Sequence, residues 1–530
     1  MTDSSAFTEA QALYSEGRFA ESASRCRAYL STAPGDAAAV RLYARIAESM
    51  GMSSEAIVVY QRLLELLPED NDALNAIAWH QHQNGDLKLA VDSAKKALAA
   101  SPRSPLTLLT SGTVFLAAGD PERGESLLRQ AVAAGASSLR VNEVLTQHYL
   151  TLGEFDKALM LSRETIKAYP DSALGYLSLA RAKRFHEEDE DARKLRTLIE
   201  QDGSLRAPFA NSPRDRAQAL GALYKMASDL GRHQAAWDYL EEIKKPLRLA
   251  AAADVIGLNG ALYGRVTSVF TSRFMEESRR TGSAATDPIF VVGLPRSGTT
   301  LLERLISASP RVVAAGERTE IEDIRKVLCA RLGSDEQDID ALTKAAPGSW
   351  NSAAAEYLMR VRRNISPSEF FVDKMPGNFV NLGFIRCLFP RAKIIHMHRH
   401  PVANCFSLYE QDFGARLQYN LDQQTLGRYY LQYRDLMEYW RQNLPGGFLE
   451  ISYEDLVADF PSTARCVSDY LEIELSPDAL EASQTSGAVR TASQFQVRQP
   501  IYTTSLHKWR DYKSYLTPLM EVLKPTLDEA

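Results

Sequence analysis

Residues 288–307 read PIFVVGLPRSGTTLLERLIS, and this stretch decides the fold of the C-terminal half of the chain. Residues 289–292 form an unbroken apolar run, which predicts a parallel strand buried on both faces. A short loop follows from Gly293 to Gly298, and apolar residues then recur at helical spacing. A strand, a glycine-bounded loop and a helix in this order build an anion site. The reason is that the first amides of a helix have no partner within it and its dipole favours negative charge.

The composition of this loop limits which anion it suits. The spacing of Gly293 and Gly298 matches a P-loop up to its second glycine. A nucleoside triphosphate P-loop continues with lysine and a hydroxyl residue, which serve the phosphates and magnesium. Here Thr299 and Thr300 follow, and the cation is Arg296 inside the loop. We therefore expect an anion held by amides, hydroxyls and one guanidinium, and the pattern disfavours an ATP-dependent P-loop kinase.

The sequence PRSGTT after a buried strand resembles the 5′-phosphosulfate loop of the sulfotransferases. This resemblance implies 3′-phosphoadenylyl sulfate (PAPS) as the sulfuryl donor and co-substrate. It assigns the 5′-phosphosulfate to Arg296, Ser297, Gly298, Thr299 and Thr300. No metal is implied, because sulfuryl transfer needs none.

A second motif follows the predicted strand at residues 393–398. Arg399 comes directly after that strand, Pro401 suits the first turn of a helix, and Ser407 lies about two turns into it. A guanidinium with a hydroxyl suits a second phosphate. The pairing R-x-P…S resembles the 3′-phosphate motif of sulfotransferases, in the order and at the spacing of that family. The alternative is an arginine at a strand end and an unrelated helical serine.

Within the sulfotransferases, the segment GERT at 316–319 resembles the tyrosylprotein branch. There the glutamate matching Glu317 is the catalytic base. A tyrosine hydroxyl has a pKa of about 10, so a carboxylate must take its proton as it attacks sulfur. Lys374 resembles the lysine that meets the bridging oxygen of the donor, and Ser493 resembles a transition-state-stabilising serine. The alternatives are an early-helix glutamate favoured by the dipole and a solvated strand-end lysine.

Later positions complete the resemblance, which covers roughly residues 288–509. Tyr453 and Lys508 match nucleotide contacts, as does the lid-like segment 493–502. Two positions depart from the tyrosylprotein branch. Gln411 stands where that branch has a basic residue, and Glu320 stands where it has an arginine that handles acidic substrates. Glu320 therefore argues against an acidic tyrosine-containing acceptor.

A 34-residue period organises the first third of the chain. It is kept by the glycines at 17, 51, 85, 119 and 153, by a small residue five positions after each, and by prolines at 34, 68, 102 and 170. The glycine permits a tight turn between two helices, the small residue lets them approach, and the proline ends the second helix. The pattern resembles the tetratricopeptide (TPR) repeat, which implies an α-solenoid of five repeats over residues 1–175. Such arrays commonly bind proteins or peptides on one face, and a scaffold or dimer interface is the plainer alternative.

Beyond residue 175 the period fails. The polar stretches 186–194 and 211–216 predict an insertion or loop. A helical pair resumes over 222–243, where Gly231 and Ala236 keep the internal spacing of the repeat, and a further helix is expected at roughly 255–280. We interpret residues 176–285 as a divergent helical repeat that caps the solenoid, followed by a linker.

Strands and helices alternate over residues 286–530. Besides the first strand, we expect strands at 370–372, 393–398 and 448–452. The alternation predicts an α/β, P-loop-like sulfotransferase domain with a mainly parallel sheet. Ligands of such folds bind beyond the carboxyl ends of the strands, where the polar candidates fall.

Composition excludes several other classes of function. The net charge of −6 gives no indication of nucleic-acid binding, no run is apolar enough to span a bilayer, and the N-terminus lacks a signal region. The five scattered cysteines have no zinc spacing and indicate reduced thiols in the cytoplasm. His396, His398 and His400 alternate along a strand, but no carboxylate or cysteine at ligand spacing accompanies them. The aromatic run 429–440 indicates core packing first and a wall of the acceptor site second.

These patterns together predict a cytoplasmic, PAPS-dependent sulfotransferase. Its TPR array would recruit a protein or peptide, with tyrosine as the acceptor, and the TPR-plus-sulfotransferase layout resembles bacterial proteins. The alternatives are sulfation of a carbohydrate or small hydroxyl compound, and a TPR scaffold with an inactive nucleotide domain. A homodimer is left open.

Overall fold

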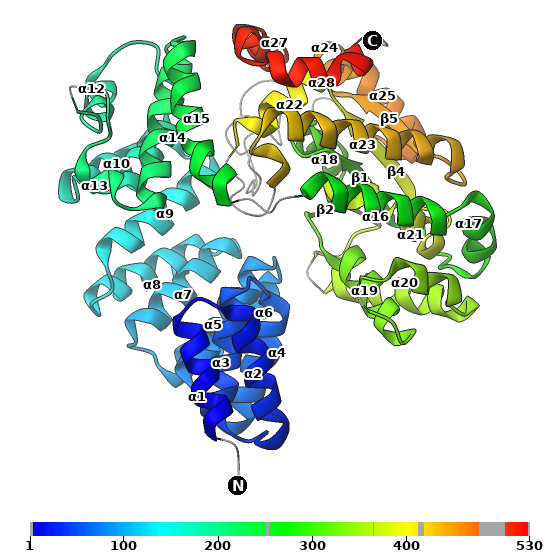
Figure 1. Cartoon of the computed structure of the whole chain (residues 1–530), viewed down its shortest axis with the longest axis horizontal. Helices are drawn as coiled ribbons and strands as arrows, with labels where there is room; N and C mark the ends of the chain where they lie inside the picture. The colour runs from blue at the N-terminus through cyan, green and yellow to red at the C-terminus, as the bar shows by residue number, and fades with distance from the viewer. Residues whose placement is uncertain are drawn as a thin grey trace. The chain divides into compact units, whose positions relative to one another are not determined.

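A computed structural model describes residues 4–200, 202–250, 254–335, 337–363, 365–411, 418–475 and 504–527 (Figure 1). The chain forms two compact units, Met1–His148 and Tyr149–Ala530, and the boundary falls inside α9 (Ser138–Leu152). The subdivision expected at residues 175 and 285 is finer than this and stays a prediction.

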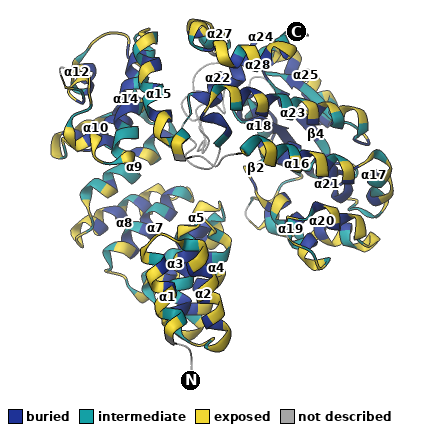
Figure 2. Ribbon diagram, viewed as in Figure 1, coloured by how far each residue is buried: buried dark blue, intermediate teal, exposed yellow. Residues whose placement is uncertain are grey.

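The first unit is an array of helix pairs. Its other helices are α1 (Ser4–Ser15), α2 (Phe19–Thr32), α3 (Ala37–Ser49), α4 (Ser53–Leu66), α5 (Asn71–Gln83), α6 (Leu87–Ala100), α7 (Pro105–Ala117) and α8 (Pro121–Ala133). Each odd-numbered helix packs on the even-numbered helix that follows it, and Figure 2 shows the buried faces in dark blue. The five periodic glycines all have left-handed φ values, from 73° at Gly51 to 85° at Gly119. A Cβ on Gly124 would lie 2.7 Å from Leu116, so the small residue is needed for the helices to approach. The predicted solenoid is therefore confirmed.

The second unit begins with further helices. They are α10 (Phe155–Ala168), α11 (Ala173–Ala182), α12 (Glu190–Arg196), α13 (Ala207–Ala210), α14 (Pro213–Asp229), α15 (His233–Ala250), α16 (Val255–Val269), α17 (Ser272–Ser278) and the 3₁₀ turn η1 (Arg279–Thr281). The stretches 186–194 and 211–216, expected as an insertion or loop, contain the starts of α12 and α14. The prediction of a single helix over 255–280 is wrong, because two helices, α16 and α17, occupy this stretch. The Thr271 hydroxyl accepts a 3.2 Å hydrogen bond from the Phe274 amide and so caps the start of α17.

The divergent helix pair packs against the α/β part of its unit. Trp237 of α15 stacks on Tyr409 and Tyr515, with ring centroids 5.6 and 5.3 Å apart. Further along α15, Lys244 Nζ donates to the Gln411 carbonyl at 2.9 Å, and Arg248 Nε donates to the Leu421 carbonyl at 2.6 Å. The pair expected to end the solenoid is therefore also part of the core of the sheet-containing region.

A parallel sheet organises the rest of the second unit. Its strands are β1 (Pro288–Gly293), β2 (Val312–Gly316), β3 (Phe370–Asp373), β4 (Lys393–His398) and β5 (Leu449–Ser452), and their order is β2-β3-β1-β4-β5. All four pairings are parallel. The helices around it are α18 (Thr299–Ser307), α19 (Glu320–Arg331), α20 (Pro347–Arg362), α21 (Leu382–Leu388), α22 (Pro401–Tyr409), α23 (Gln423–Asn443), α24 (Tyr453–Ala458), α25 (Phe460–Leu471), α27 (Thr504–Asp511) and α28 (Thr517–Leu527). The 3₁₀ turns are η2 (Ile339–Lys344), η3 (Pro376–Asn381), η5 (Gln418–Asn420) and η7 (Lys513–Tyr515).

The four strands expected from the sequence are present, and β2 was missed. This strand lies at the edge of the sheet, is only partly buried, and carries a register irregularity between Ala314 and Gly316. Alanine and glycine are depleted in strands, so the short run VVAAG gives a weaker strand signal than the β-branched and aromatic run of β1.

Alternation along β1 divides the interior into two cores. Ile289 and Val291 pack with α18, α24 and α25, whereas Phe290 and Val292 pack with the helices on the other face, including α20, α21 and α23. This is the two-sided burial that the apolar run predicts. The central strands β1 and β4 are largely buried, whereas the edge strands β2 and β5 are only partly buried.

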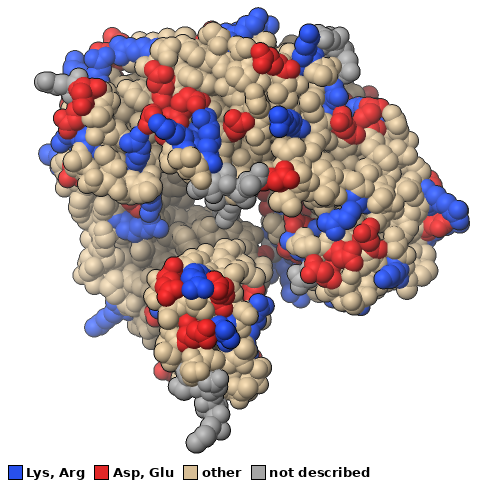
Figure 3. Space-filling view, viewed as in Figure 1, with Lys and Arg blue, Asp and Glu red and all other residues tan. Residues whose placement is uncertain are grey.

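Surface charge, thiols and helix hydropathy agree with the composition. On the face shown in Figure 3, basic and acidic side chains are interspersed. All five cysteines are free thiols, and four of them are buried. Among the helices of the described ranges, none combines the length and apolar character that a bilayer crossing requires.

Candidate active site

Each of the five strands ends at a residue or loop that the sequence singled out. Along the carboxyl edge of the sheet, in spatial order, these are Glu317 after β2, Lys374 after β3, the loop 294–298 after β1, Arg399 after β4 and Tyr453 after β5. Carboxyl ends of parallel strands share one edge, which is where doubly wound folds bind ligands. The topology therefore gathers residues that lie between positions 294 and 453 of the sequence.

The loop after β1 is held in a conformation that only glycine tolerates at its two ends. Gly293 has φ 152°, and a Cβ there would lie 2.2 Å from the Met397 carbonyl oxygen of β4. Gly298 has φ 103°, and its Cβ would lie 2.5 Å from the ring of Tyr453. Between them Arg296 adopts φ 69°, which is uncommon for a residue with a side chain and is typical of functional sites.

The hydroxyl residues of the loop face inward. Ser297, Thr299 and Thr300 are all buried. The Ser297 hydroxyl is shielded from solvent and makes no hydrogen bond to any residue that the structure describes. A buried hydroxyl without a partner is costly unless a ligand supplies one. With the amino end of α18 beside it, this site fits an anion.

Arg296 joins the loop to the second motif. Its Nε donates to Ser407 Oγ of α22 at 3.1 Å, and its carbonyl accepts from Arg399 Nη1 at 3.2 Å. Asn404 of α22 also holds the loop, by donating to the Pro295 carbonyl at 3.0 Å. The two anion-binding motifs predicted from the sequence therefore lie within one hydrogen bond of each other.

Tyr453 and Lys508 complete the cluster on the β4–β5 side. The Arg399 guanidinium lies over the Tyr453 ring, 4.6 Å from its centroid, and this ring also packs on Gly298. Lys508 of α27 donates a hydrogen bond to Glu410, the residue that follows α22, and the phenol of Tyr224 donates to the same carboxylate.

Lys374 and Glu317 form an ion pair on the other side of the loop. Lys374 is fully buried, and its Nζ donates to Glu317 Oε1 at 2.6 Å. The Glu317 side chain is 46% exposed, so solvent or an acceptor can reach it. A second carboxylate, Glu303 of α18, lies 3.8 Å from the same ammonium.

Asp373, the residue before Lys374, is held in place by a hydrogen bond from helix α20. Asp373 is fully buried and accepts a 2.6 Å hydrogen bond from the Tyr357 phenol of α20. Burial raises the pKa of Asp373 to about 7, although the bond from Tyr357 works in the opposite direction. This contact fixes the end of β3 and with it the root of the Lys374 side chain.

Glu320 is not presented to an acceptor. It is buried at the start of α19 and bound by the guanidinium of Arg318, whose Nε donates to Glu320 Oε2 at 3.0 Å. Its charge is therefore paired inside the protein. The Glu320 charge therefore does not itself repel an acidic acceptor, although the arginine of the tyrosylprotein branch is absent at this position.

Four other predictions from the sequence concern Ser493, Gln411, His396 and the aromatic run 429–440. Ser493, with the lid-like segment 493–502, lies outside the described residues. Gln411 lies two residues beyond the end of α22, and its carbonyl accepts from Lys244 and from Asn420. The two ring nitrogens of His396 make hydrogen bonds to Glu450 and Tyr433, and burial lowers the pKa of this histidine, so its role is structural.

The aromatic run on α23 is largely buried in the core, as expected.

Sequence reasoning missed Glu303, Asn404 and the Asp373–Tyr357 pair. Glu303 had a detectable signal, because it falls on the buried stripe of α18 with Thr299, Thr300 and Ile306, where an acid is unusual. The others are ordinary polar residues whose partners lie far away in the sequence.

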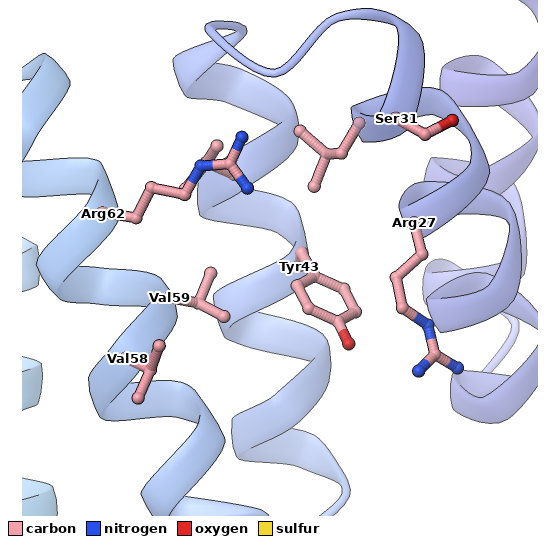
Figure 4. A pocket seen from close by; sticks show the side chains of 8 residues that line it. Arg27, Ser31, Tyr43, Val58, Val59 and Arg62 are labelled. Carbon is pink, nitrogen blue, oxygen red and sulfur yellow. The ribbon is translucent and has the colours of Figure 1, made fainter. Parts of the chain in front are cut away.

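The first unit contains a pocket of about 310 Å³ among α2, α3 and α4. Figure 4 shows it, with Tyr43 and Val59 at its wall and the guanidinium groups of Arg27 and Arg62 on either side. An apolar wall between two cations suits an apolar side chain next to an acidic group.

Comparisons with family models agree with this organisation. Residues 288–477 match the sulfotransferase family, and residues 13–79 and 109–173 match models of the tetratricopeptide repeat. The chain thus joins TPR repeats to a sulfotransferase-family domain.

Individual relatives are more distant. An uncharacterised protein of Aquifex aeolicus is 29% identical over 409 residues, which cover 75% of this chain and 52% of that protein. Protein-tyrosine sulfotransferase 1 of Danio rerio is 24% identical over 242 residues, which cover 42% of this chain and 65% of the fish protein. The chain therefore spans about half to two thirds of the length of these relatives.

One solved structure is the sulfotransferase domain of an olefin synthase from Synechococcus PCC 7002. It is 20% identical, with a TM-score of 0.31, and the match covers 43% of this chain and 90% of that domain. A TM-score at that level is too low to support any inference about this chain.

Proposed function

We propose that this chain, with its TPR repeats and sulfotransferase-family domain, transfers a sulfuryl group from PAPS to an acceptor hydroxyl. The observation that carries the proposal is the row of strand ends that brings an anion-binding loop, two guanidinium groups, a buried ammonium and an accessible carboxylate to one edge. An enzyme that transfers a sulfuryl group needs these side chains, because it must bind a polyanionic donor and remove a proton from the acceptor hydroxyl.

The residues present fit PAPS. The buried Ser297 hydroxyl lacks a partner among the described residues, and Gly293 and Gly298 leave the loop without side chains where neighbouring strands approach. Arg296, Ser297, Gly298, Thr299 and Thr300 would hold the 5′-phosphosulfate. Arg399 and Ser407 would hold the 3′-phosphate, with Tyr453 and Lys508 as further nucleotide contacts. PAPS would supply the sulfuryl group.

The remaining groups would act on the acceptor and on the developing charge. Glu317 takes the proton of the acceptor hydroxyl while the acceptor oxygen bonds to sulfur. The bond from sulfur to the bridging oxygen breaks, and its electron pair stays on the 5′-phosphate. Lys374 balances that charge from its buried position, and Ser493 would assist it. No step requires a metal.

A protein or peptide acceptor, modified on tyrosine, is the form of this proposal that we favour. TPR arrays commonly bind polypeptides, and the fish relative is named as a protein-tyrosine sulfotransferase. The pocket between Arg27 and Arg62 would take an apolar residue with an acidic neighbour from such an acceptor. Glu320 does not oppose this, because Arg318 pairs it. The cytoplasm is the location we propose, in keeping with the free thiols.

Binding of 3′-phosphoadenosine 5′-phosphate (PAP), measured by calorimetry without magnesium, tests the donor site. We expect wild type to bind PAP and Arg399→Ala to bind it roughly 10- to 100-fold more weakly, as for a lost charge-assisted hydrogen bond. Adenosine 5′-phosphate should show a smaller difference, because it lacks the 3′-phosphate. Arg311→Ala is the matched control, since Arg311 precedes β2 at the opposite edge of the sheet and pairs with Glu369.

Absence of PAP binding to folded wild type would refute the sulfotransferase assignment and favour a TPR scaffold. Binding that depends on magnesium would favour a kinase instead. Once binding is established, labelled PAPS should mark polypeptides on tyrosine. Labelling of glycans or small phenols alone would refute the polypeptide acceptor but not the sulfotransferase activity.

A further inference from the structure

Glu303 is a buried carboxylate that the proposed reaction leaves without a role. It lies on α18, the helix that follows the anion-binding loop, and is only 7% exposed. Its Oε2 lies 3.8 Å from Lys374 Nζ. Its Oε1 is buried and makes no hydrogen bond within the described part of the chain.

Lys374 therefore faces two carboxylates of unequal exposure. Glu317 binds it at 2.6 Å and reaches solvent, whereas Glu303 lies further away and is enclosed. If all three groups were charged, this buried site would carry a net negative charge. A buried carboxylate with one unpartnered oxygen resists ionisation. The site is close to neutral only when Glu303 carries a proton.

The other groups around Glu303 come from the two strand ends packed against it. At the end of β2, the Gly316 amide donates to Glu303, and the charge of the following Glu317 opposes the ionisation of Glu303. At the end of β3, Lys374 favours its ionisation, and the charge of Asp373 interacts with it. Arg318 and Glu320 act on Asp373. Burial, the largest effect, raises the pKa of Glu303 to about 7.

We infer that Glu303 is a positioning residue for Lys374, and that its protonation state sets whether this ammonium is available to the sulfuryl donor. Neutral Glu303 leaves Lys374 free to turn from Glu317 towards the donor, which also frees Glu317 as the base. Ionised Glu303 retains Lys374 and adds a negative charge beneath a polyanionic ligand. The inference depends on the proposed function, because it assumes a phosphorylated donor at the loop.

The consequence is a proton taken up when the donor site fills. A polyanion near Glu303 favours the neutral carboxyl, so binding raises the pKa of Glu303 above 7 and draws a proton from solution at higher pH. Affinity for PAP is greatest where Glu303 is already protonated, and it falls as pH rises through its pKa, by up to about tenfold per pH unit. A glutamate that kept the same protonation state in the free and the PAP-bound protein would produce no such linkage.

The test is calorimetric titration of the full chain with PAP, without magnesium, in buffers of different ionisation enthalpy between about pH 6.5 and 8.5. Wild type should take up as much as about one proton in the upper half of this range. Glu303→Gln, which keeps the shape of the neutral carboxyl, should lose that uptake and keep its affinity at high pH. Titration of the PAP phosphates, whose pKa is about 6, contributes equally to both proteins.

Asp373→Asn is the matched second variant, because Asp373 is the other buried acid at this site whose pKa lies near 7. It should retain the proton uptake. Equal uptake by wild type and Glu303→Gln would overturn the inference, as would loss of the uptake in Asp373→Asn instead. If wild type bound no PAP at all, the proposed function itself would fail. That result is distinct from normal PAP binding with an unchanged proton count, which refutes only the role of Glu303.

Discussion

Replacing Gly298 by alanine tests whether the anion-binding loop, Tyr453 and Arg399 behave as one packed unit. Gly298 has φ 103°, and its Cβ would lie 2.5 Å from Tyr453 Cδ2 and 2.8 Å from Met397 Cε. The methionine end can move, but the tyrosine ring is held beneath the Arg399 guanidinium, 4.6 Å away. A single methyl group at this position should therefore displace a ring and, through it, a candidate phosphate ligand.

The cost has two parts. A left-handed backbone costs about 1–2 kcal/mol for a residue with a Cβ, and overpacking adds about 1–3 kcal/mol. The sum, about 2–5 kcal/mol, should lower the melting temperature by about 2–4 °C per kcal/mol for a domain of this size class. Gly333→Ala is the matched control. Gly333 has φ 77°, but nothing lies within 4 Å of its added Cβ, so it carries the backbone cost alone.

The assays are thermal unfolding and calorimetric binding of PAP. Gly298→Ala should melt below Gly333→Ala and bind PAP at least about tenfold more weakly, which corresponds to about 1.4 kcal/mol. Gly333→Ala should bind PAP as wild type does. If the two variants melted together and both bound PAP normally, the loop would not depend on its contact with Tyr453, and the packing argument would be wrong.

Two further predictions concern stability and acceptor recruitment. Tyr357→Phe removes the donor to buried Asp373 and should cost about 1.5–3 kcal/mol above pH 7, where the carboxylate is charged. The folded pKa of Asp373 exceeds its unfolded value of about 4, so stability falls as pH rises between them, and urea unfolding should show a smaller effect of the variant near pH 5 than near pH 8. The double variant Arg27→Ala with Arg62→Ala should raise KM for an acidic peptide acceptor about tenfold, the effect of roughly 1.4 kcal/mol of lost binding, with PAP binding unchanged. Arg25→Ala on the same helix is its control, and an equal KM in all three proteins would exclude the pocket.

The elements that could be predicted are those whose signal is local. The loop 293–298 is bounded by glycines and preceded by a doubly buried strand, so both its conformation and its place in the sheet can be derived from one short stretch. Arg399 and Tyr453 follow strands directly, and the shared carboxyl edge of a parallel sheet then brings them together. The repeats were predictable because the same constraint recurs every 34 residues.

The elements that could not be predicted depend on distant partners. β2 is a short, only partly buried strand of mostly small residues, so its sequence gives a weak strand signal. Lys508 is hydrogen-bonded to Glu410, which lies 98 residues earlier in the sequence. Trp237 of the divergent repeat stacks on Tyr409, which lies more than 170 residues later. The Arg318–Glu320 pair is an exception, because the two residues are close in the sequence but only the fold shows that both are buried.

The cations of the candidate site already have partners inside the protein, and this changes how binding should be understood. Lys374 is paired with Glu317, Lys508 with Glu410, and Arg296 with Ser407. A polyanionic donor therefore exchanges existing contacts for its own, and the net free energy is the difference between two sets of charge-assisted bonds. The exchange at Lys374 is the one with a chemical consequence. The carboxylate that loses its ammonium is the group proposed to accept the acceptor proton, so filling the donor site and activating the base would be the same event.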